Sequence, residues 1–478
     1  MGEPAGGGRV LVASNRGPIS FHLDPDGQLS ARRGGGGVVS GLLTAAAQAE
    51  LLWVCAALSH ADRAAARAAP AGLLELSAGS SVQMLDIPET TFGRAYNGVA
   101  NSVLWFIHHM LYDLPGQPQF GPDFSTDWAS YRDYNQAFAR ALAAVPGPAR
   151  AVVQDYHLAL VPRMLAQLRP GVKIAHFSHT PWAPPDYYRV LPDDVAREVL
   201  EGILGADHAG FLCRRWADAF ADCCAVILGA EVDRERGLIS YRGHVTSIGV
   251  HPLGVDASEL RDRAAQPDVT QHAAELARLA GGRKLIVRID RTELSKNILR
   301  GLAAYRELLV SRPQWRGQVM HLAFAYPSRT DLAQYRAYAA AVADLAAQIE
   351  AEFATDEWTP LVLQADDDYA RSLAGYQVAD VLLVNPVRDG MNLVAKEGPI
   401  VSDRGCALVL SREAGAAAEL GEAALLVNPF DISATAQAMH EALSMSDGER
   451  ASRCARLAAA GGAVPPARWL ADQLAALG

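Results

Sequence analysis

The sequence predicts an α/β protein with two doubly wound domains, each built on a parallel sheet that helices cover on both faces. Three observations support this fold class. The chain has 478 residues, more than one hydrophobic core usually organises. Short apolar runs alternate with longer amphipathic segments, which is typical of strand–helix–strand units. This alternation occurs twice, on either side of a segment at 249–256 that contains Gly and Pro.

In the first half, four short apolar runs predict buried strands, and two longer stretches predict helices. The strands are expected at Val10–Ala13, Ala151–Val153, Lys173–Phe177 and Ala209–Leu212. The segments Trp128–Ala144 and Val161–Leu168 have the spacing of apolar residues expected of helices. These elements belong to an expected N-terminal domain at 1–250.

The second half repeats the scheme in an expected domain at 251–450. Strands are predicted at Lys284–Ile289, Val319–Ala325, Val381–Val384, Ala407–Leu410 and Ala424–Val427. Helices are predicted at Arg300–Val310 and Asp331–Phe353. A helical tail at 451–478 is expected to pack back across the domains. Ligands of doubly wound folds bind beyond the carboxyl ends of the strands, so residues that follow strands are the candidates for function, in a cleft between the domains.

The composition argues against several classes of protein. The formal net charge of -10 disfavours a nucleic-acid partner, which would require a basic surplus. The six cysteines form no C-x-x-C pair, so neither a disulfide framework nor a zinc site is expected. The start of the chain lacks a signal-peptide pattern, and no apolar run reaches membrane-spanning length. We therefore expect a cytoplasmic protein without a membrane partner. A homo-oligomer is compatible with the sequence.

Polar residues follow the strands of the first half. Arg16 comes after the first strand, where a guanidinium suits bidentate phosphate binding, although a surface arginine in a turn is equally compatible. Four glycines at 34–37 match no complete nucleotide-binding motif and by themselves favour a flexible loop. Tyr96, Trp105 and Trp182 would suit the faces of sugar rings, although core packing is the commoner fate of aromatic side chains.

Two of these segments offer both a carbohydrate and a metal interpretation. Asp155 and His157 end one strand, and His176 and His179 end the next. An ionised aspartate can accept hydrogen bonds from sugar hydroxyls. The residues lack the tight spacing of a metal motif such as H-E-x-x-H, so contact with carbohydrate is favoured and no metal is expected.

Basic residues follow the strands of the second half. Arg291 and Lys296 lie at a strand-to-helix passage, and Arg329 ends a later strand. Single basic residues are usually solvated. Three at strand ends in an acidic protein favour the binding of phosphate groups, including stabilisation of a leaving diphosphate.

The segment 385–397 carries the strongest pattern. A predicted strand runs into P-V-R-D-G-M-N, after which L-V-A-K-E begins a helix. Exposed N–H groups and the positive end of the helix dipole suit a diphosphate there. Gly390 permits close approach of the backbone, and Glu397 can reach ribose hydroxyls. The alternative is an ordinary loop in which Asp389 or Asn392 caps the helix.

Taken together, these segments resemble trehalose-6-phosphate synthases, which are retaining enzymes of glycosyltransferase family 20 with the GT-B fold. The resemblance extends from Val10 to Asp431, and its most specific part is R-D-G-M-N-L-V-A-K-E at 388–397. The blocks S-N-R at 14–16, N-S-V-L-W at 101–105, D-Y-H-L at 155–158 and N-P-F-D at 428–431 follow in the same order. The resemblance implies two Rossmann-like domains that face a central cleft.

The resemblance also implies site residues. The acceptor, glucose 6-phosphate, would contact Arg16, Tyr96, Trp105, Asp155 and Arg329. The donor would contact Gly36, Gly37, His179, Arg291, Lys296, Tyr369, Asp389, Gly390, Met391, Asn392, Leu393, Val394, Ala395, Lys396 and Glu397. The residues implied in catalysis are Asp155, His179, Arg291 and Lys296.

The family reaction moves glucose from a nucleotide sugar, UDP- or GDP-glucose, to glucose 6-phosphate with retention of configuration. It yields α,α-trehalose 6-phosphate. By resemblance it needs no cofactor or metal, and the departing phosphate takes the proton of the acceptor.

Three departures from the family pattern are visible. Glu293 replaces the usual Asp of R-x-D-x-x-K, and Cys55 to Ala57 stand where a second Trp often follows the one matching Trp53. Trp182 replaces a common Phe. Validamycin-type pseudo-glycosyltransferases, which couple cyclitols, share that Pro-Trp and a similar R-T-x-x-x-K loop, and they use guanosine-linked donors. These features favour GDP-glucose slightly over UDP-glucose. A cyclitol-coupling enzyme and a non-catalytic homologue are the alternatives. The intact D-G-M-N block ranks the first below the synthase. The second is ranked lower because none of the charged residues Arg16, Arg291, Lys296, Arg329 and Glu397 is lost.

Overall fold

The computed structural model describes residues 9–24, 26–33, 50–77 and 79–478. The chain divides into two compact units. Unit 1 comprises Met1–Leu253 together with Pro466–Gly478, and unit 2 comprises Gly254–Pro465. The chain therefore enters unit 2 once and returns to unit 1 for its last helix. The segment 451–478 is divided between the two units, because its first helix belongs to unit 2.

Unit 1 is built on a ten-stranded sheet with the order β10-β11-β12-β9-β8-β7-β1-β4-β6-β5. The strands are β1 (Arg9–Ala13), β4 (Leu51–Ala56), β5 (Leu74–Ser77), β6 (Ser80–Leu85), β7 (Ala149–Gln154), β8 (Lys173–Ser178), β9 (His208–Phe211), β10 (Glu231–Asp233), β11 (Leu238–Tyr241) and β12 (His244–Val250). The strands from β12 to β6 run parallel, and antiparallel pairing occurs only near the two edges. A separate hairpin joins β2 (Ile19–Leu23) to β3 (Leu29–Arg33). The parallel strands bring their carboxyl ends to one edge.

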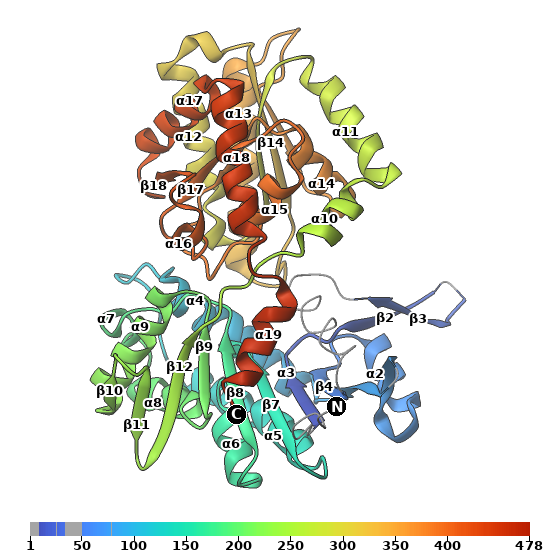
Figure 1. The fold of residues 1–478 in the computed structure, drawn as a ribbon, viewed down its shortest axis with the longest axis vertical. Helices are drawn as coiled ribbons and strands as arrows, with labels where there is room; N and C mark the ends of the chain where they lie inside the picture. The colour runs from blue at the N-terminus through green and yellow to red at the C-terminus, as the bar shows by residue number, and fades with distance from the viewer. Residues whose placement is uncertain (1–8, 25, 34–49, 78) are drawn as a thin grey trace, which may run out of the picture. The chain divides into compact units, whose positions relative to one another are not determined.

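The helices of unit 1 pack on this sheet. They are α2 (His60–Ala68), η1 (Pro70–Gly72), α3 (Glu89–Gly93), η2 (Arg94–Leu104), α4 (Trp105–His109), α5 (Pro122–Ala143), η3 (Tyr156–Leu158), α6 (Val161–Leu168), α7 (Pro185–Tyr188), α8 (Asp193–Ile203), α9 (Arg214–Cys223), η4 (Cys224–Leu228) and α19 (Pro466–Ala475). Helix α5 packs against η2 and α6, and α19 lies against β7 (Figure 1). The fully buried Trp469 joins α19 to β8, because its ring meets Phe177 edge-on at 4.9 Å.

Unit 2 is built on a six-stranded sheet in which every pairing is parallel, with the order β15-β14-β13-β16-β17-β18. The strands are β13 (Lys284–Arg291), β14 (Val319–Tyr326), β15 (Leu361–Gln364), β16 (Val381–Val384), β17 (Ala407–Ser411) and β18 (Leu425–Val427). All residues of β14 and β16 are buried, as expected of strands covered on both faces.

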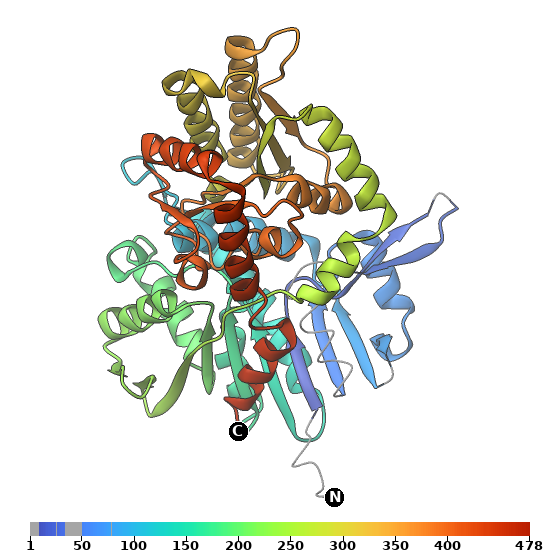
Figure 2. The ribbon, with the colours of Figure 1, turned by 45° about the horizontal axis from the view of Figure 1, so that its top comes forward.

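Two groups of helices cover the sheet of unit 2. They are α10 (Ala257–Ala264), α11 (Pro267–Ala280), η5 (Leu294–Lys296), α12 (Ile298–Ser311), η6 (Pro313–Trp315), α13 (Ala333–Phe353), α14 (Tyr369–Val378), α15 (Val394–Val401), α16 (Ala417–Leu420), α17 (Ile432–Ser444) and α18 (Asp447–Gly461). Helices α12, α13 and α17 pack together, and α15 packs against α14, α10 and α18 (Figures 1 and 2). This arrangement sandwiches the sheet between helices.

The fold class expected from the sequence is confirmed, since each predicted strand and helix is present within a few residues of its expected bounds. The prediction omitted the strands β2 to β6, β10 to β12 and β15. Among the described residues, no helix is both long enough and apolar enough to cross a membrane.

The packing of α19 generates a stability prediction. Trp469→Ala should lower the free energy of unfolding by about 3–5 kcal/mol, because it empties a fully buried site against β8. Urea denaturation followed by circular dichroism measures the change. Leu426→Ala is the control, since Leu426 is 49% exposed and its loss should change stability by less than about 0.5 kcal/mol. A tryptophan variant as stable as that control would exclude α19 from the core.

Candidate active site

The loop after β1 presents Arg16 through a chain of buried hydrogen bonds. Nε1 of Trp53 donates to Oγ of Ser14 at 2.7 Å, and that hydroxyl donates to the carbonyl of Arg16 at 2.7 Å. The hydroxyl of Tyr134 donates to Oδ1 of Asn15 at 2.6 Å. The side chains of Trp53 and Tyr134 therefore fix the backbone of the loop. The side chain of Arg16 is exposed at the carboxyl edge of the sheet.

Tyr96 and Trp105 lie on consecutive helices but differ in exposure. Tyr96, on η2, is half-buried and stacks between Phe92, at a ring-centroid distance of 5.2 Å, and His157, at 5.6 Å. Trp105 begins α4 and is only 4% exposed, with its ring 4.3 Å from that of His109. The stack links Tyr96 to the loop after β7, whereas Trp105 is mainly a core residue with little surface to offer a ligand.

The loops after β7 and β8 bring Asp155 and His179 together. Asp155 adopts φ = 70°, a left-handed conformation that is uncommon outside glycine and is often found at functional sites. Its Oδ1 accepts a hydrogen bond from the backbone N–H of His179 at 3.1 Å. Nε2 of His179 lies 2.7 Å from Oε1 of Gln154. Because an amide oxygen only accepts, Nε2 carries the proton and Nδ1 is left as an acceptor.

Burial determines the charge of this imidazole. Desolvation, followed by the nearby His176, lowers the pKa of His179 to about 3. His179 is therefore neutral near pH 7, and it can donate or accept hydrogen bonds without adding charge. In the part of the chain that the structure describes, no group of three or more His, Cys, Asp or Glu side chains is placed to hold a metal ion.

In unit 2, the loops after β13 and β16 are joined by an ion pair. Nζ of Lys296 donates to Oδ2 of Asp389 at 2.6 Å, and both side chains are mostly buried. Burial alone would lower the pKa of Lys296, but the carboxylates of Asp389, Asp290 and Glu293 outweigh this effect and raise it. The backbone N–H of Val387 also donates to the carbonyl of Ser295 at 2.8 Å. The two loops therefore form one connected surface.

The start of α15 is capped by Asn392. Its Oδ1 accepts from the backbone N–H of Ala395 at 3.1 Å, and its Nδ2 donates to Oδ2 of Asp389 at 3.1 Å. Asn392 adopts φ = 77°. The capping role that the sequence left open is thus present, and it orients Asp389 towards Lys296 at the same time.

The other residues of the 388–397 motif differ in exposure. Leu393 and Val394 are half-buried, whereas Lys396 is fully buried and its Nζ donates to Oε1 of Glu419 at 2.8 Å. Its ammonium therefore points to α16 and is separate from Lys296. Glu397 is half-buried, and its Oε2 accepts from the hydroxyl of Tyr376 at 3.2 Å. Desolvation raises the pKa of Glu397.

Close backbone packing holds Gly390 and Met391. A Cβ at Gly415, in the loop after β17, would lie 1.9 Å from the carbonyl oxygen of Gly390. The N–H of Ala416 donates to the carbonyl of Met391 at 2.8 Å. Gly415 is therefore a residue of the site that the sequence patterns missed, because only the fold brings these two loops together.

Two further cations lie at this edge. Arg291 has a side chain that is 61% exposed and pairs with Glu293 at 3.2 Å. Arg329 adopts φ = 46° and donates to the hydroxyl of Tyr335.

Tyr369 begins α14, is 53% exposed, and lies beneath the guanidinium of Arg263 at 5.9 Å. Gly36 and Gly37 lie outside the described residues.

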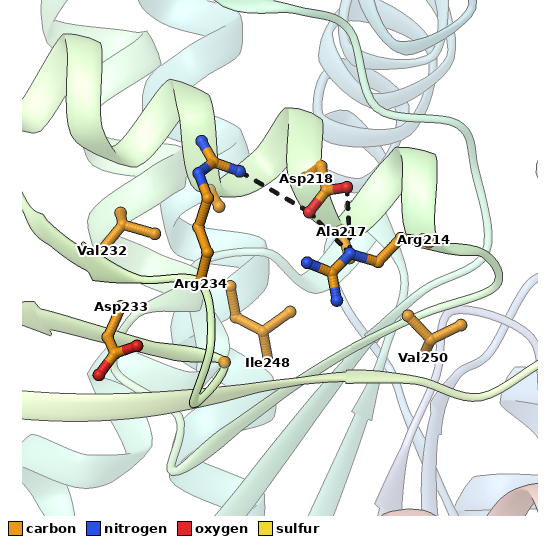
Figure 3. A pocket seen from close by; sticks show the side chains of 10 residues that line it. Arg214, Ala217, Asp218, Val232, Asp233, Arg234, Ile248 and Val250 are labelled. Atoms are coloured by element: carbon orange, nitrogen blue, oxygen red, sulfur yellow. Dashed lines mark hydrogen bonds and ion pairs between the residues drawn. The ribbon is translucent and has the colours of Figure 1, made fainter.

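A small cavity in unit 1 lies away from these residues, between α9 and the strands β10 to β12 (Figure 3). Its volume is about 40 Å³, and Arg214 and Arg234 both pair there with Asp218. Small-molecule sites usually measure about 300–1,000 Å³, so this cavity is too small for a sugar nucleotide.

Two α/β units with parallel sheets and loops at the strand ends are the architecture of a GT-B glycosyltransferase. The sequence model of glycosyltransferase family 20 matches residues 8–477, so the chain belongs to this family. The resemblance drawn from the sequence motifs is thereby confirmed.

Relatives and solved structures agree with this family. The chain is 32% identical over 458 residues to an alpha,alpha-trehalose-phosphate synthase (UDP-forming) of Schizosaccharomyces pombe, with 94% of this chain and 86% of that protein covered. A structure of an alpha,alpha-trehalose-phosphate synthase (UDP-forming) from Burkholderia vietnamiensis matches with a TM-score of 0.87 and 29% identity over 99% of both chains. An E. coli structure bound with UDP-2-fluoro glucose matches with a TM-score of 0.84 and 28% identity, covering 98% of this chain and 99% of that one. Two other curated relatives are longer, and the chain spans 60% and 54% of their lengths.

Buried histidines of unit 1 predict a loss of stability in acid. Burial is the main cause that lowers the pKa of His108 and His179 to about 3 and that of His176 to about 4. In the unfolded chain they titrate near pH 6.5, so below that pH the unfolded state binds more protons. The free energy of unfolding should fall from pH 6.5 towards pH 4, by at most about 1.4 kcal/mol per pH unit for each histidine.

Urea denaturation at pH 7 and pH 5 measures this effect. His176→Gln is the matched variant, and it should show a shallower dependence on pH than the parent protein. Equal stability at both pH values would contradict the assignment of neutral buried imidazoles.

Proposed function

We propose that this chain transfers glucose from UDP-glucose to glucose 6-phosphate with retention of configuration, forming α,α-trehalose 6-phosphate and UDP. The observation that carries the proposal is the joined edge of unit 2. There, Arg291 ends β13 and Lys296 lies on the loop that follows. This loop is tied to the capped start of α15. Two cations beside a helix N-terminus suit a diphosphate that gains charge as it leaves.

The donor is proposed to bind with its diphosphate on Arg291, Lys296 and the first N–H groups of α15. Glu397 would accept hydrogen bonds from the ribose, and Tyr369 would lie near the base. Asp389 and His179 would contact the glucose. Oδ2 of Asp389 accepts from Lys296 at 2.6 Å, and this bond fixes the position of the carboxylate. The departing phosphate would then take the proton from the attacking hydroxyl of the acceptor.

In unit 1, Arg16 is proposed to contact the phosphate of the acceptor and Asp155 its sugar. In unit 2, Arg329 is proposed as a further contact of that phosphate. Tyr96 is half-buried and is well suited to line that site, whereas Trp105, at 4% exposure, would act by supporting the helix beside it. A phosphate that pairs with a guanidinium gains charge-assisted hydrogen bonds, which are stronger than neutral ones.

Uracil is proposed as the donor base, which departs from the slight preference for guanine drawn from the sequence. That preference rested on Trp182 and on the R-T-x-x-x-K form of the loop at 291–296. Trp182 is only 1% exposed and stacks on Tyr188 in the interior of unit 1. Its identity reflects core packing and carries no information about a base. The names of the S. pombe and Burkholderia relatives describe UDP-forming enzymes. The cyclitol-coupling alternative used the same tryptophan and loses that support.

No metal or cofactor is proposed. The role that a divalent cation plays in other phosphate chemistry would fall to Arg291, Lys296 and the helix start. This assignment uses only groups of the chain itself.

A product assay tests the proposed function. Purified protein should convert glucose 6-phosphate and UDP-glucose into trehalose 6-phosphate, detected by mass spectrometry, and should do so faster than with GDP-glucose. Addition of EDTA should leave the rate unchanged. No product from either donor would refute the synthase, and a faster reaction with GDP-glucose would restore the guanine preference.

Arg329→Ala tests the acceptor site. The variant should lose about 1.5–3 kcal/mol of transition-state stabilisation, or roughly 10- to 150-fold in kcat/KM for glucose 6-phosphate, because one charge-assisted phosphate contact is lost. Arg306→Ala is the control, since Arg306 is an exposed arginine paired with Glu352 and lies on α12 away from the strand ends. Unchanged acceptor kinetics in the Arg329 variant would remove this residue from the site.

A further inference from the structure

We propose that Glu293 is a positioning residue whose carboxylate holds Arg291 and the loop of Arg329 in place for both phosphorylated substrates. This inference rests on the proposed function, because that function assigns Arg291 to the donor and Arg329 to the acceptor. Glu293 itself would touch neither substrate.

The carboxylate of Glu293 is buried at the junction of two loops. Glu293 is only 2% exposed, and its backbone N–H donates to the carbonyl of Arg291 at 2.7 Å. Its Oε1 lies 3.2 Å from Nη1 of Arg291 and accepts from Oγ of Ser328 at 3.0 Å. A buried carboxylate is costly without such partners, so its position is tightly constrained. Glu293 therefore connects the loop after β13 to the loop after β14.

The second loop needs this support. Ser328 directly precedes Arg329, whose backbone adopts φ = 46°. A left-handed conformation in a residue other than glycine persists only where its surroundings determine it. The hydrogen bond from Ser328 to Glu293 fixes one side of this residue, and the bond from Arg329 to Tyr335 directs its guanidinium. Loss of the carboxylate would release the first of these restraints.

Glu293 also balances charge at the edge of unit 2. Its burial would raise its pKa, but the positive charges of Arg291, Arg329 and Lys296 hold the pKa at about 2. The carboxylate is therefore ionised at neutral pH. It lets three cations gather before any phosphate has bound, since like charges would otherwise repel one another.

The experiment compares Glu293→Gln with Glu293→Asp in steady-state kinetics with UDP-glucose and glucose 6-phosphate. The amide keeps the shape of the side chain but loses its charge, so KM should rise about tenfold for both substrates, as expected when charge-assisted contacts weaken. The aspartate keeps the charge with a shorter reach and should restore most of the loss. Arg291→Ala should mainly affect the donor, and Arg329→Ala the acceptor.

Asp380→Asn is the matched control. Asp380 is also a buried carboxylate of unit 2, 5% exposed, and its Oδ2 accepts from Arg404 at 3.2 Å, but it lies at the amino ends of the strands. This variant should lower the melting temperature without raising either KM. Ser328→Ala is a milder variant that should weaken acceptor binding, and it keeps the test available if Glu293→Gln fails to fold.

Three results would overturn the inference: Glu293→Gln with both KM values unchanged, a change in only one of them, or no rescue by aspartate in a folded protein. Failure of the proposed function is distinguishable, because the parent protein would then make no trehalose 6-phosphate. Calorimetric titration with UDP and with glucose 6-phosphate would still measure whether Glu293 supports the binding of both phosphorylated ligands.

Discussion

A buried guanidinium sets the geometry at the carboxyl edge of unit 2. Arg288 is fully buried in β13, where its Nη2 donates to Asp290 at 2.7 Å and to the carbonyl of Lys296 at 3.0 Å, and its Nη1 donates to Asn385 at 3.3 Å. Removing one partner of a buried ion pair costs about 3–5 kcal/mol, so these bonds must form together. They fix the turn after β13 against the end of β16. The pairing of Lys296 with Asp389 depends on that arrangement.

The same constraint explains how an acidic chain, with a formal net charge of -10, can favour phosphorylated ligands. Two of the cations at the edge are paired with carboxylates, Arg291 with Glu293 and Lys296 with Asp389. Their charges are therefore balanced before a ligand binds. A phosphate then meets cations that are already oriented, so less ordering is required on binding.

Residue patterns alone predicted most strands of the parallel core, but not β4, β6 or β15, and with them the loops that carry the candidate site. Strand-end residues were identifiable because apolar runs mark where a buried strand stops. The orientation of side chains was not accessible in this way, as Trp182 illustrates, because its interior partners come from distant elements. Gly415 was equally invisible, since its close approach to Gly390 arises only when β17 is placed beside β16.

The helix that follows β16 shows how one motif can serve two purposes. Glu397 lies in the first turn of α15 and is half-buried. The next residue towards the helix start, Lys396, binds Glu419, although burial lowers its pKa. Its charge therefore ties α15 to α16 and is not directed to the edge. The first turn of α15 is fixed by the bond from Lys396 to Glu419 and is capped by Asn392. We infer that the motif's lysine serves the diphosphate indirectly, by fixing the N–H groups that would bind it.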